Sequence, residues 1–209
     1  MRTDEEQIDD LKQWWKKYGG PVATGLAVGL ALVLGSRAWM DYRENQRISA
    51  SSEYEQLRGE LAADNVDAAR QRGAYLIDNY ARTPYAALAA FGLAKMHVAH
   101  GDFTAALERL QWALDNAREP EVTHVARLRL ARVMAAGGET AAALTLLDGA
   151  KQGEFVAAYE ELRGDLYASS GDNERARAAY LRALDRLKGG PGADLVQIKL
   201  DDLGPGAQG

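Results

Sequence analysis

The side chains of this sequence that are best suited to metal chemistry lie in one short stretch. His97 and His100 are three residues apart, a spacing that places two imidazoles on one face of a helix, and Asp102 follows closely. A zinc-type site needs at least three protein ligands, and the pattern suggests no third one. His97 also falls where two helices of a repeat pack together, as described below. We therefore expect a buried core histidine and no metal site.

Other catalytic arrangements find no support in the sequence. The GGET segment at 137–140 lacks the Lys-Ser/Thr pair of a phosphate-binding loop. Acid pairs such as Glu160-Glu161 and Asp201-Asp202 are expected on solvated helix faces, where carboxylates usually lie. The chain has no cysteine, which excludes disulfides, zinc–thiolate centres and cysteine nucleophiles. The sequence therefore predicts a protein that is not an enzyme and that needs no cofactor.

Composition narrows the fold and the partners. The 209 residues carry 25 Lys and Arg against 30 Asp and Glu, a formal charge of −5. A nucleic-acid-binding protein needs a basic surface to neutralise phosphates, so this balance argues against one. Ala and Leu are abundant, while aromatic residues make up only 8%. This composition favours helix throughout and predicts an all-α protein.

An apolar segment near the N-terminus is long enough to cross a membrane. Residues 22–35 contain no charge, and the window extended to residue 40 contains only Arg37. At about 1.5 Å per residue this window nearly spans a hydrocarbon core of about 30 Å. We predict a transmembrane helix over 21–41, with Pro21 in its first turn. Interfacial aromatic and basic residues flank it, as in membrane anchors: Trp14, Trp15, Lys16, Lys17 and Trp39.

A cleaved signal peptide is the main alternative, because Ser36-Arg37-Ala38 offers small residues at a peptidase spacing. The long acidic segment before the span and the aromatic flanks favour an uncleaved anchor. Four basic residues precede the span and three follow it, which only slightly favours a cytoplasmic N-terminus. We expect residues 1–20 in the cytoplasm and the body of the chain on the other side.

Small residues recur within the predicted span and could form a face on which a second helix docks. Residues four apart are Ala23, Ala27, Ala31 and Gly35, and Gly25 and Gly29 form a GxxxG motif. Such spacing allows two helix backbones to approach closely in lipid. The alternative is that Gly and Ala are simply common in such helices, and the sequence does not decide between the two.

The rest of the chain repeats itself. Turns begin at Asp64, Gly101, Gly138 and Gly171, so successive copies are 37, 37 and 33 residues apart, and the first copy is the weakest. Small residues recur before the turns, at Ala94, Ala131 and Gly164. This is the tetratricopeptide (TPR) pattern of helix pairs. We predict a solenoid of about four pairs over 42–188: 44–62 with 66–80, 84–100 with 103–116, 121–136 with 140–151, and 154–169 with 173–187.

The first helices of such pairs line a concave surface. Phe91 and Lys95 on one of them correspond to Leu128 and Arg132 on the next, because the two turns are 37 residues apart. An apolar residue and a cation at each step could form a groove for a peptide with apolar and acidic side chains. The alternative is that Phe91 and Leu128 pack inside the solenoid and the cations are solvated. Glu161 and Asp165 take these places in the last repeat, so the basic stripe ends there.

The tail, 189–209, opens with a Gly-Gly-Pro-Gly linker. Leu195, Ile198 and Leu203 are expected on one face of a short helix that covers the last repeat, since terminal repeats need a cap. Residues 204–209 are expected to be disordered.

The N-terminal segment adds a resemblance. Asp4-Glu5-Glu6-Gln7, followed by Leu11-Lys12-Gln13-Trp14-Trp15-Lys16-Lys17-Tyr18-Gly19, one apolar span and a TPR body, resembles the YfgM family of ancillary SecYEG translocon subunits. The resemblance implies a single-pass bacterial inner-membrane protein with a periplasmic TPR domain. It also implies, as partners, the translocon, the PpiD-type periplasmic chaperone and newly translocated polypeptides. The Gly/Pro-rich tail is longer and looser than this family leads us to expect.

Two functions therefore compete. The first is a non-enzymatic scaffold at the periplasmic face of the Sec translocon that aids handover of newly translocated proteins to chaperones. The second is a TPR adaptor of another envelope machine, such as one for cell-wall synthesis or outer-membrane assembly. The Trp-Trp-Lys segment and an uncleaved span favour the first, whereas a cleaved, soluble periplasmic product would favour the second.

Overall fold

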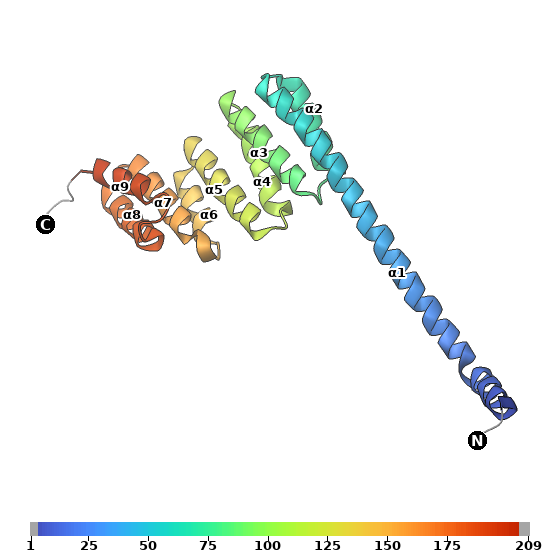
Figure 1. Cartoon of the computed structure of the whole chain (residues 1–209). Helices are drawn as coiled ribbons and strands as arrows, with labels where there is room; N and C mark the ends of the chain where they lie inside the picture. The colour runs from blue at the N-terminus through green and yellow to red at the C-terminus, as the bar shows by residue number, and fades with distance from the viewer. Residues whose placement is uncertain (1–3, 205–209) are drawn as a thin grey trace. The chain divides into compact units, whose positions relative to one another are not determined.

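The chain consists of helices joined by short turns. The computed structural model describes residues 4–204, except for the side chains of residues 4–7, 10, 11 and 13. Over this part the regular structure is entirely helical (Figure 1), which confirms the all-α prediction. The chain divides into two compact units, Met1–Ser49 and Ala50–Gly209. The predicted disorder of residues 204–209 falls outside the described residues except at Gly204, whose N–H donates to the carbonyl of Asp201 at 3.0 Å.

The first helix, α1, runs without a break from Asp4 to Ala62. One expectation was wrong here: Pro21 lies inside the helix instead of in its first turn. The segments predicted at 21–41 and 44–62 are parts of this one continuous helix. A proline inside a helix removes one hydrogen bond and crowds the carbonyl four residues earlier, which bends the helix. Figure 1 shows such a kink in the dark blue part of α1.

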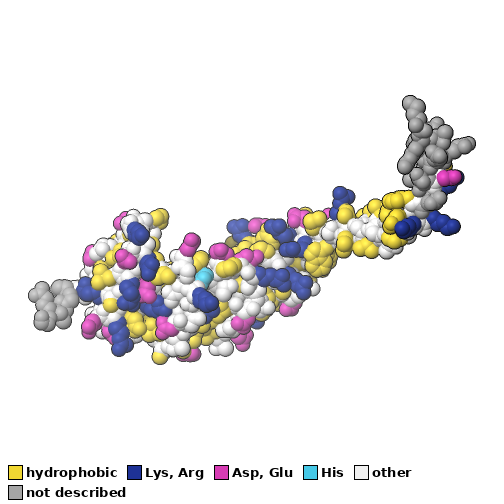
Figure 2. All heavy atoms as spheres, turned by 90° about the horizontal axis from the view of Figure 1, so that it is seen from below, with side chains coloured by type: hydrophobic (Ala, Val, Ile, Leu, Met, Phe, Trp, Pro, Cys, Tyr) yellow, Lys and Arg dark blue, Asp and Glu magenta, His cyan; other side chains and the backbone are white. Residues whose placement is uncertain are grey.

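By length and composition α1 could cross a membrane. Every side chain from residue 21 to residue 40 is exposed in the isolated chain, and Figure 2 shows this stretch as mostly apolar and uncharged groups. Trp14, Trp15 and Trp39 are also about half exposed or more. An apolar surface of this kind needs a non-aqueous environment, so these exposures fit a membrane segment with aromatic flanks.

The second unit begins with the end of α1 and continues through short helices. They are α2 (Val66–Asn79), α3 (Pro84–Ala99), α4 (Phe103–Asn116), α5 (Pro120–Ala136), α6 (Thr140–Asp148), α7 (Val156–Ser169), α8 (Asn173–Leu187) and α9 (Ala193–Asp202). The predicted pairs match these helices closely. The largest difference is at α6, which ends at Asp148, and a short 3-10 turn (Gly153–Phe155) then leads into α7.

The four turns predicted from the repeat share one geometry. Each has a residue with a left-handed backbone: Asp64 (φ 56°), Gly101 (φ 75°), Gly138 (φ 90°) and Gly171 (φ 79°). The N–H of the next residue donates to the carbonyl five positions earlier, at 2.9 to 3.0 Å. This is the Schellman ending of a helix, for which glycine is preferred because it lacks Cβ. The repeats are therefore equivalent in structure, including the first one.

The second helices of two pairs start with matched caps. Asp102 accepts a hydrogen bond from the N–H of Ala105, and Asp172 accepts one from the N–H of Arg175, both at 3.1 Å. Pro84 and Pro120 open α3 and α5, where a missing N–H costs nothing. The glycine, aspartate and proline of the linking segments thus fix where each helix begins and ends.

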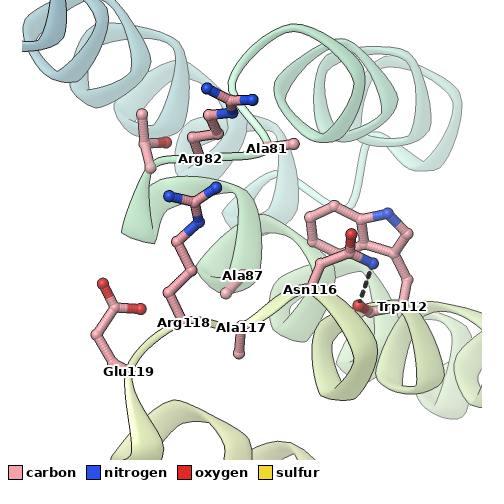
Figure 3. Close-up of a pocket in the computed structure, with 9 residues that line it drawn as sticks. Ala81, Arg82, Ala87, Trp112, Asn116, Ala117, Arg118 and Glu119 are labelled. Atoms are coloured by element: carbon pink, nitrogen blue, oxygen red, sulfur yellow. Dashed lines mark hydrogen bonds between the residues drawn. The ribbon is translucent and has the colours of Figure 1, made fainter.

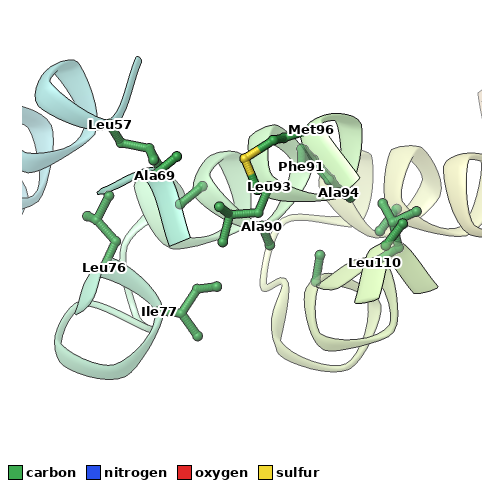
Figure 4. Close-up of a cluster of buried hydrophobic side chains, with 14 of the residues drawn as sticks. Leu57, Ala69, Leu76, Ile77, Ala90, Phe91, Leu93, Ala94, Met96 and Leu110 are labelled. Carbon is green, nitrogen blue, oxygen red and sulfur yellow. The ribbon is translucent and has the colours of Figure 1, made fainter. Parts of the chain in front are cut away.

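The core runs along the second unit in consecutive clusters. The first joins the end of α1 to α2–α5 through Leu57, Leu76, Leu93 and Leu110 (Figure 4), and the next two continue through α5–α7 and α7–α9. Leu57 is fully buried, so the end of α1 is part of the repeat body. Each cluster joins neighbouring helices only, as expected of a solenoid.

The side chains at two buried positions of every repeat compensate each other in size. One lies seven residues before the turn and the other nine residues after it, and all eight residues are buried: Leu57 with Gly73, Ala94 with Leu110, Ala131 with Leu147, and Gly164 with Tyr180. A large residue at one position accompanies a small one at the other. Close-packed interiors require such compensation, because both overpacking and voids are destabilising.

Helix α9 covers the end of the last repeat. Val196 and Leu200 are buried against Tyr180 and Ala183 of α8, whereas Leu195 and Ile198 are exposed. The expected buried face was therefore wrong for Leu195 and Ile198, whereas Leu203 does pack against this cluster. The helix is rotated so that Lys199 reaches α7 and ion-pairs with Glu161, with a nitrogen–oxygen distance of 2.6 Å. The sequence pattern could not reveal this polar contact, which lies 38 residues away.

Candidate functional site

In the described part of the chain, neither His97 nor His100 belongs to a group of His, Asp and Glu side chains that could hold a metal ion. His97 is buried, with its Nδ1 3.2 Å from the Asp102 carboxylate, though outside hydrogen-bond geometry. Burial lowers the pKa of His97, while the Asp102 charge opposes this shift. His100 is exposed and lies 3.1 Å from Asp64. His97 is thus the packed core histidine that the sequence predicts.

The predicted groove residues divide into two kinds. Phe91 and Leu128 are only 7% and 6% exposed and belong to two different core clusters. Lys95 and Arg132 are exposed. The structure therefore places the two apolar residues in the core, as in the packing alternative, and leaves the two cations at the surface. A peptide on this face would meet the cations first, and their role in binding stays a prediction.

The equivalent turns extend this pattern to α1. Tyr54 lies ten residues before the turn at Asp64, as Phe91 lies before Gly101, and Arg58 lies six residues before it, as Lys95 does. Tyr54 is half-buried, and its ring centroid lies 5.8 Å from that of Tyr85 on α3. The sequence analysis missed both residues, although subtracting 37 from 91 and 95 would have found them.

Arg129 connects the two middle repeats. Its guanidinium lies over the ring of Phe91, 4.5 Å from the ring centroid, which is cation–π geometry. Burial lowers the pKa of Arg129, the neighbouring charge of Arg132 lowers it further, and Tyr54 opposes these effects. Tyr54, Phe91, Arg129 and Arg132 therefore lie close together, although they come from α1, α3 and α5. The repeat spacing could not identify Arg129, because the equivalent position of the preceding repeat is a glycine, Gly92.

In the last repeat, acidic residues take the places of the cations, and these acids are already paired within the protein. The Lys199 ammonium lies 2.6 Å from Glu161 and 2.9 Å from Asp165, and Tyr180 donates to Asp165 at 2.9 Å. Burial lowers the pKa of Lys199, but its hydrogen bonds to both acids outweigh this, so the net shift is upward. Burial, followed by the bond to Asp165, raises the pKa of Tyr180. One ammonium thus pairs with both acids inside the protein, and the group keeps one net negative charge.

The environment of Glu160 differs from the one expected from the sequence. This residue was expected on a solvated face, but it is buried and accepts from Arg163 at 2.6 Å and from Arg182 at 2.8 Å. Arg163 also donates to Asp148 at 2.8 Å. This network joins α6, α7 and α8, and its members satisfy one another, as buried charges must. Its role is structural.

Comparison with known proteins identifies the family. A family model described as a tetratricopeptide repeat-like domain matches residues 12–205. The ancillary SecYEG translocon subunit of Aggregatibacter actinomycetemcomitans is 28% identical over 200 residues, which cover 96% of this chain and 97% of the relative. The chain belongs to the YfgM family.

Two further YfgM relatives carry the same name. The ancillary SecYEG translocon subunit of Haemophilus influenzae is 28% identical over 86% of this chain and 88% of the relative. That of Escherichia coli is 26% identical over 96% and 97%. No solved structure matches the chain. The family assignment confirms both the TPR-like body and the resemblance that the N-terminal segment suggested.

The small residues of the predicted span at 21–41 face outward in the isolated chain. Nothing lies within 4 Å of a Cβ built on Gly25, Gly29 or Gly35, and Ala23, Ala27 and Ala31 are exposed. Docking of a second helix on this face stays a prediction.

A shallow pocket lies away from the proposed groove. It is formed where the segments before α3 and α5 approach each other, and Figure 3 shows Arg82, Arg118, Trp112 and Asn116 around it. Asn116 donates to the carbonyl of Trp112 at 2.9 Å. Both arginines are exposed. The pocket is too shallow to enclose a ligand, and we assign no function to it.

Proposed function

We propose that this chain is a membrane-anchored scaffold of the Sec translocon. It would bind partners through its TPR body on the periplasmic side and aid the handover of newly translocated proteins to a PpiD-type chaperone. The observation that carries this proposal is the similarity to ancillary SecYEG translocon subunits over almost the full length of both chains, including the membrane segment. A TPR-like body without an assembled catalytic site supports binding and not catalysis.

The orientation is the second part of the proposal: residues 1–20 in the cytoplasm, a span near 21–41 and the body from 42 to 188 in the periplasm. Because the chain has no cysteine, one introduced thiol is an unambiguous reporter. We would place it at exposed Lys12 or at exposed Ala141 on α6. In intact spheroplasts, a membrane-impermeant maleimide should label Ala141→Cys and not Lys12→Cys. The reverse pattern would overturn the proposed orientation.

The partners are tested by affinity purification of the intact chain from membranes in mild detergent, with co-eluting proteins identified by mass spectrometry. Recovery of translocon subunits and a PpiD-type chaperone is the expected result. Recovery of full-length protein with neither would contradict the proposal. A variant with the body intact but the span replaced by another apolar helix is the control, because it separates contacts of the body from contacts of the membrane helix.

The alternative function, an adaptor of another envelope machine, makes a different prediction in the same experiment. A soluble form beginning near Trp39, with cell-wall or outer-membrane assembly proteins bound to it, would favour that function. The half-exposed aromatic flanks on both sides of the span favour the uncleaved anchor.

A further inference from the structure

The exposed face of α3 and α5 carries a group of cations that lack an acidic partner. Lys95, Arg129 and Arg132 form no ion pair with any residue between 4 and 204 whose side chain the structure describes. Several other arginines of the body are paired, for example Arg72 with Glu53 and Glu60, and Arg163 with Glu160 and Asp148. Other exposed cations, such as Lys151 and Arg186, also lack an ion pair, but Lys95, Arg129 and Arg132 share the adjoining helices α3 and α5 in a chain with a net charge of −5.

From this cluster we infer that the face formed by Lys95, Arg129 and Arg132, with Tyr54 beside it, binds an acidic segment of a partner polypeptide. The inference deepens the proposed scaffold function by naming the chemistry of one partner. It rests on that function only in taking the TPR body as a binding surface.

Arg129 shows why an anion would bind here. Its guanidinium is held over the Phe91 ring, 4.5 Å from the centroid, and the side chain is exposed to an incoming ligand. The ring covers one face of the guanidinium and holds it in place, so a carboxylate would meet a cation that is already positioned. Guanidinium groups also bind carboxylates through two parallel hydrogen bonds. An incoming carboxylate would therefore satisfy Arg129 and relieve its repulsion from Arg132.

The helix register sets the arrangement of the site. Lys95 and Arg132 lie at equivalent points of α3 and α5, six residues before their turns, and Arg129 lies one helical turn before Arg132. The half-buried rings of Tyr54 and Tyr85 lie on neighbouring α1 and α3. Acidic side chains would contact the cations, and apolar side chains of the same segment would contact these aromatic rings.

The two ends of the face limit the site to its middle. On α1, Arg58 already pairs with Glu55 at 3.1 Å. On α7, Glu161 and Asp165 occupy the equivalent places but are held by Lys199. Lys199 offsets one of these two negative charges, and the negative charge that remains disfavours an acidic segment at the last repeat, so the site is confined to the middle repeats.

The test measures binding of short fluorescent peptides to the full chain in nonionic detergent micelles, by fluorescence anisotropy. The probe is a peptide rich in Glu and Leu, and its control has Gln in place of each Glu. The binding variant is Lys95→Glu/Arg132→Glu. The matched control is Lys151→Glu/Arg186→Glu, which makes the same charge change at exposed positions outside this face, where the structure gives neither residue an ion pair.

We expect the acidic peptide to bind, and the Lys95→Glu/Arg132→Glu variant to bind it about tenfold more weakly or worse. The Lys151→Glu/Arg186→Glu variant should bind like the unmodified chain. Raising salt from about 0.1 M to about 1 M should weaken binding, because the screening length falls from about 10 Å to about 3 Å. Arg129→Met, which keeps an unbranched side chain over Phe91, should also weaken binding.

Three outcomes would overturn the inference. One is equal affinity for the Glu and Gln peptides, and another is an equal loss in both charge variants while circular dichroism shows both folded. The third is binding to phosphatidylglycerol vesicles, lost in Lys95→Glu/Arg132→Glu, with no binding of the acidic peptide. Absence of translocon subunits from the affinity purification would instead contradict the proposed scaffold function and leave this peptide binding unaffected.

Discussion

Replacing Gly164 with alanine tests how the last repeat is packed. Gly164 lies on α7 against the buried ring of Tyr180 on α8. A Cβ at Gly164 would overlap Cδ1 and Cε1 of that ring and lie 2.9 Å from Cζ. The ring has little room to retreat, because its hydroxyl donates to Asp165 at 2.9 Å and its other side meets α9. Either α7 and α8 must separate or Tyr180 must leave its position.

The expected loss of stability follows from three terms. Overpacking a core costs about 1–3 kcal/mol, and loss of the Tyr180–Asp165 hydrogen bond costs about 1 kcal/mol more. The higher helix propensity of alanine relative to glycine stabilises the fold by about 1 kcal/mol and offsets part of this loss. The net loss of free energy of unfolding is therefore about 1–3 kcal/mol. Gly59→Ala on α1 is the control: nothing lies within 4 Å of its Cβ, so it should stabilise by about 0.5–1 kcal/mol.

A double-mutant cycle isolates the size compensation. Tyr180→Leu leaves a cavity beside Gly164 and destabilises by itself. Combined with Gly164→Ala, it recreates the small–large pair that Ala94 and Leu110 form in the second repeat. We expect the double variant to be more stable than the sum of the single changes predicts, by about 1–2 kcal/mol.

The assay must report on α7 and α8 themselves, because repeat arrays can unfold in parts. Amide hydrogen exchange of the two helices gives their local opening free energies, and urea unfolding followed by circular dichroism gives the total. If the two changes add without coupling, or if Gly164→Ala stabilises as much as Gly59→Ala does, the packing argument is refuted.

Four further predictions follow from other parts of the chain. Asp64→Gly should relieve a left-handed backbone at φ 56°, a gain of about 0.5–1 kcal/mol, and should lose the exposed contact with His100, a cost of about 0.2–1 kcal/mol. We therefore expect a net gain below about 1 kcal/mol, which urea midpoints check. Lys199→Met should lower the opening free energy of α9 by about 1–3 kcal/mol, as for a partly buried ion pair, seen as faster amide exchange in α9 alone. Folding lowers the pKa of His97 below its ordinary 6.5, so the unfolded chain takes up the proton first. Stability should then be full above about pH 6.5 and fall below it, and His97→Met should flatten this part of the pH profile. Gly25→Leu/Gly29→Leu should reduce resonance energy transfer between labelled chains in vesicles if the GxxxG face docks helices, and unchanged transfer would remove that idea.

Much of the repeat fold follows from local chemistry. Glycine at a left-handed position, an aspartate cap or a proline at a helix start each acts within a few residues, so sequence spacing reveals it. The first repeat matched weakly for a physical reason. Its turn uses Asp64 instead of glycine, and its buried pair is reversed, with Leu57 before the turn and Gly73 after it. The total volume is preserved, but the pattern of small residues is not.

The first helix shows a different limit. Apolar composition marks where a chain meets lipid, but it does not mark where a helix ends. Between Arg37 and Ala62 the sequence has one glycine, Gly59, and no proline, and polar residues such as those at 41–47 continue a helix as well as apolar ones do. Pro21 suggested a beginning because that is its usual place. The structure instead accommodates it with a kink, so the predicted helix start became a bend.

The candidate site was only half predictable because its charges are balanced by tertiary contacts. A step of 37 residues finds Lys95 and Arg132, and would have found Tyr54 and Arg58. It cannot find Arg129, which depends on the approach of α5 to Phe91. Nor can it show that Lys199, which lies outside the four repeats, pairs with both acids on α7. Without Lys199, this face would carry cations on the middle repeats and unpaired carboxylates on the last repeat. Such a face would suit a partner that carries charges of both signs. With it, the cations of the middle repeats remain the main unbalanced charge of this face, and an acidic partner is the chemistry that complements them.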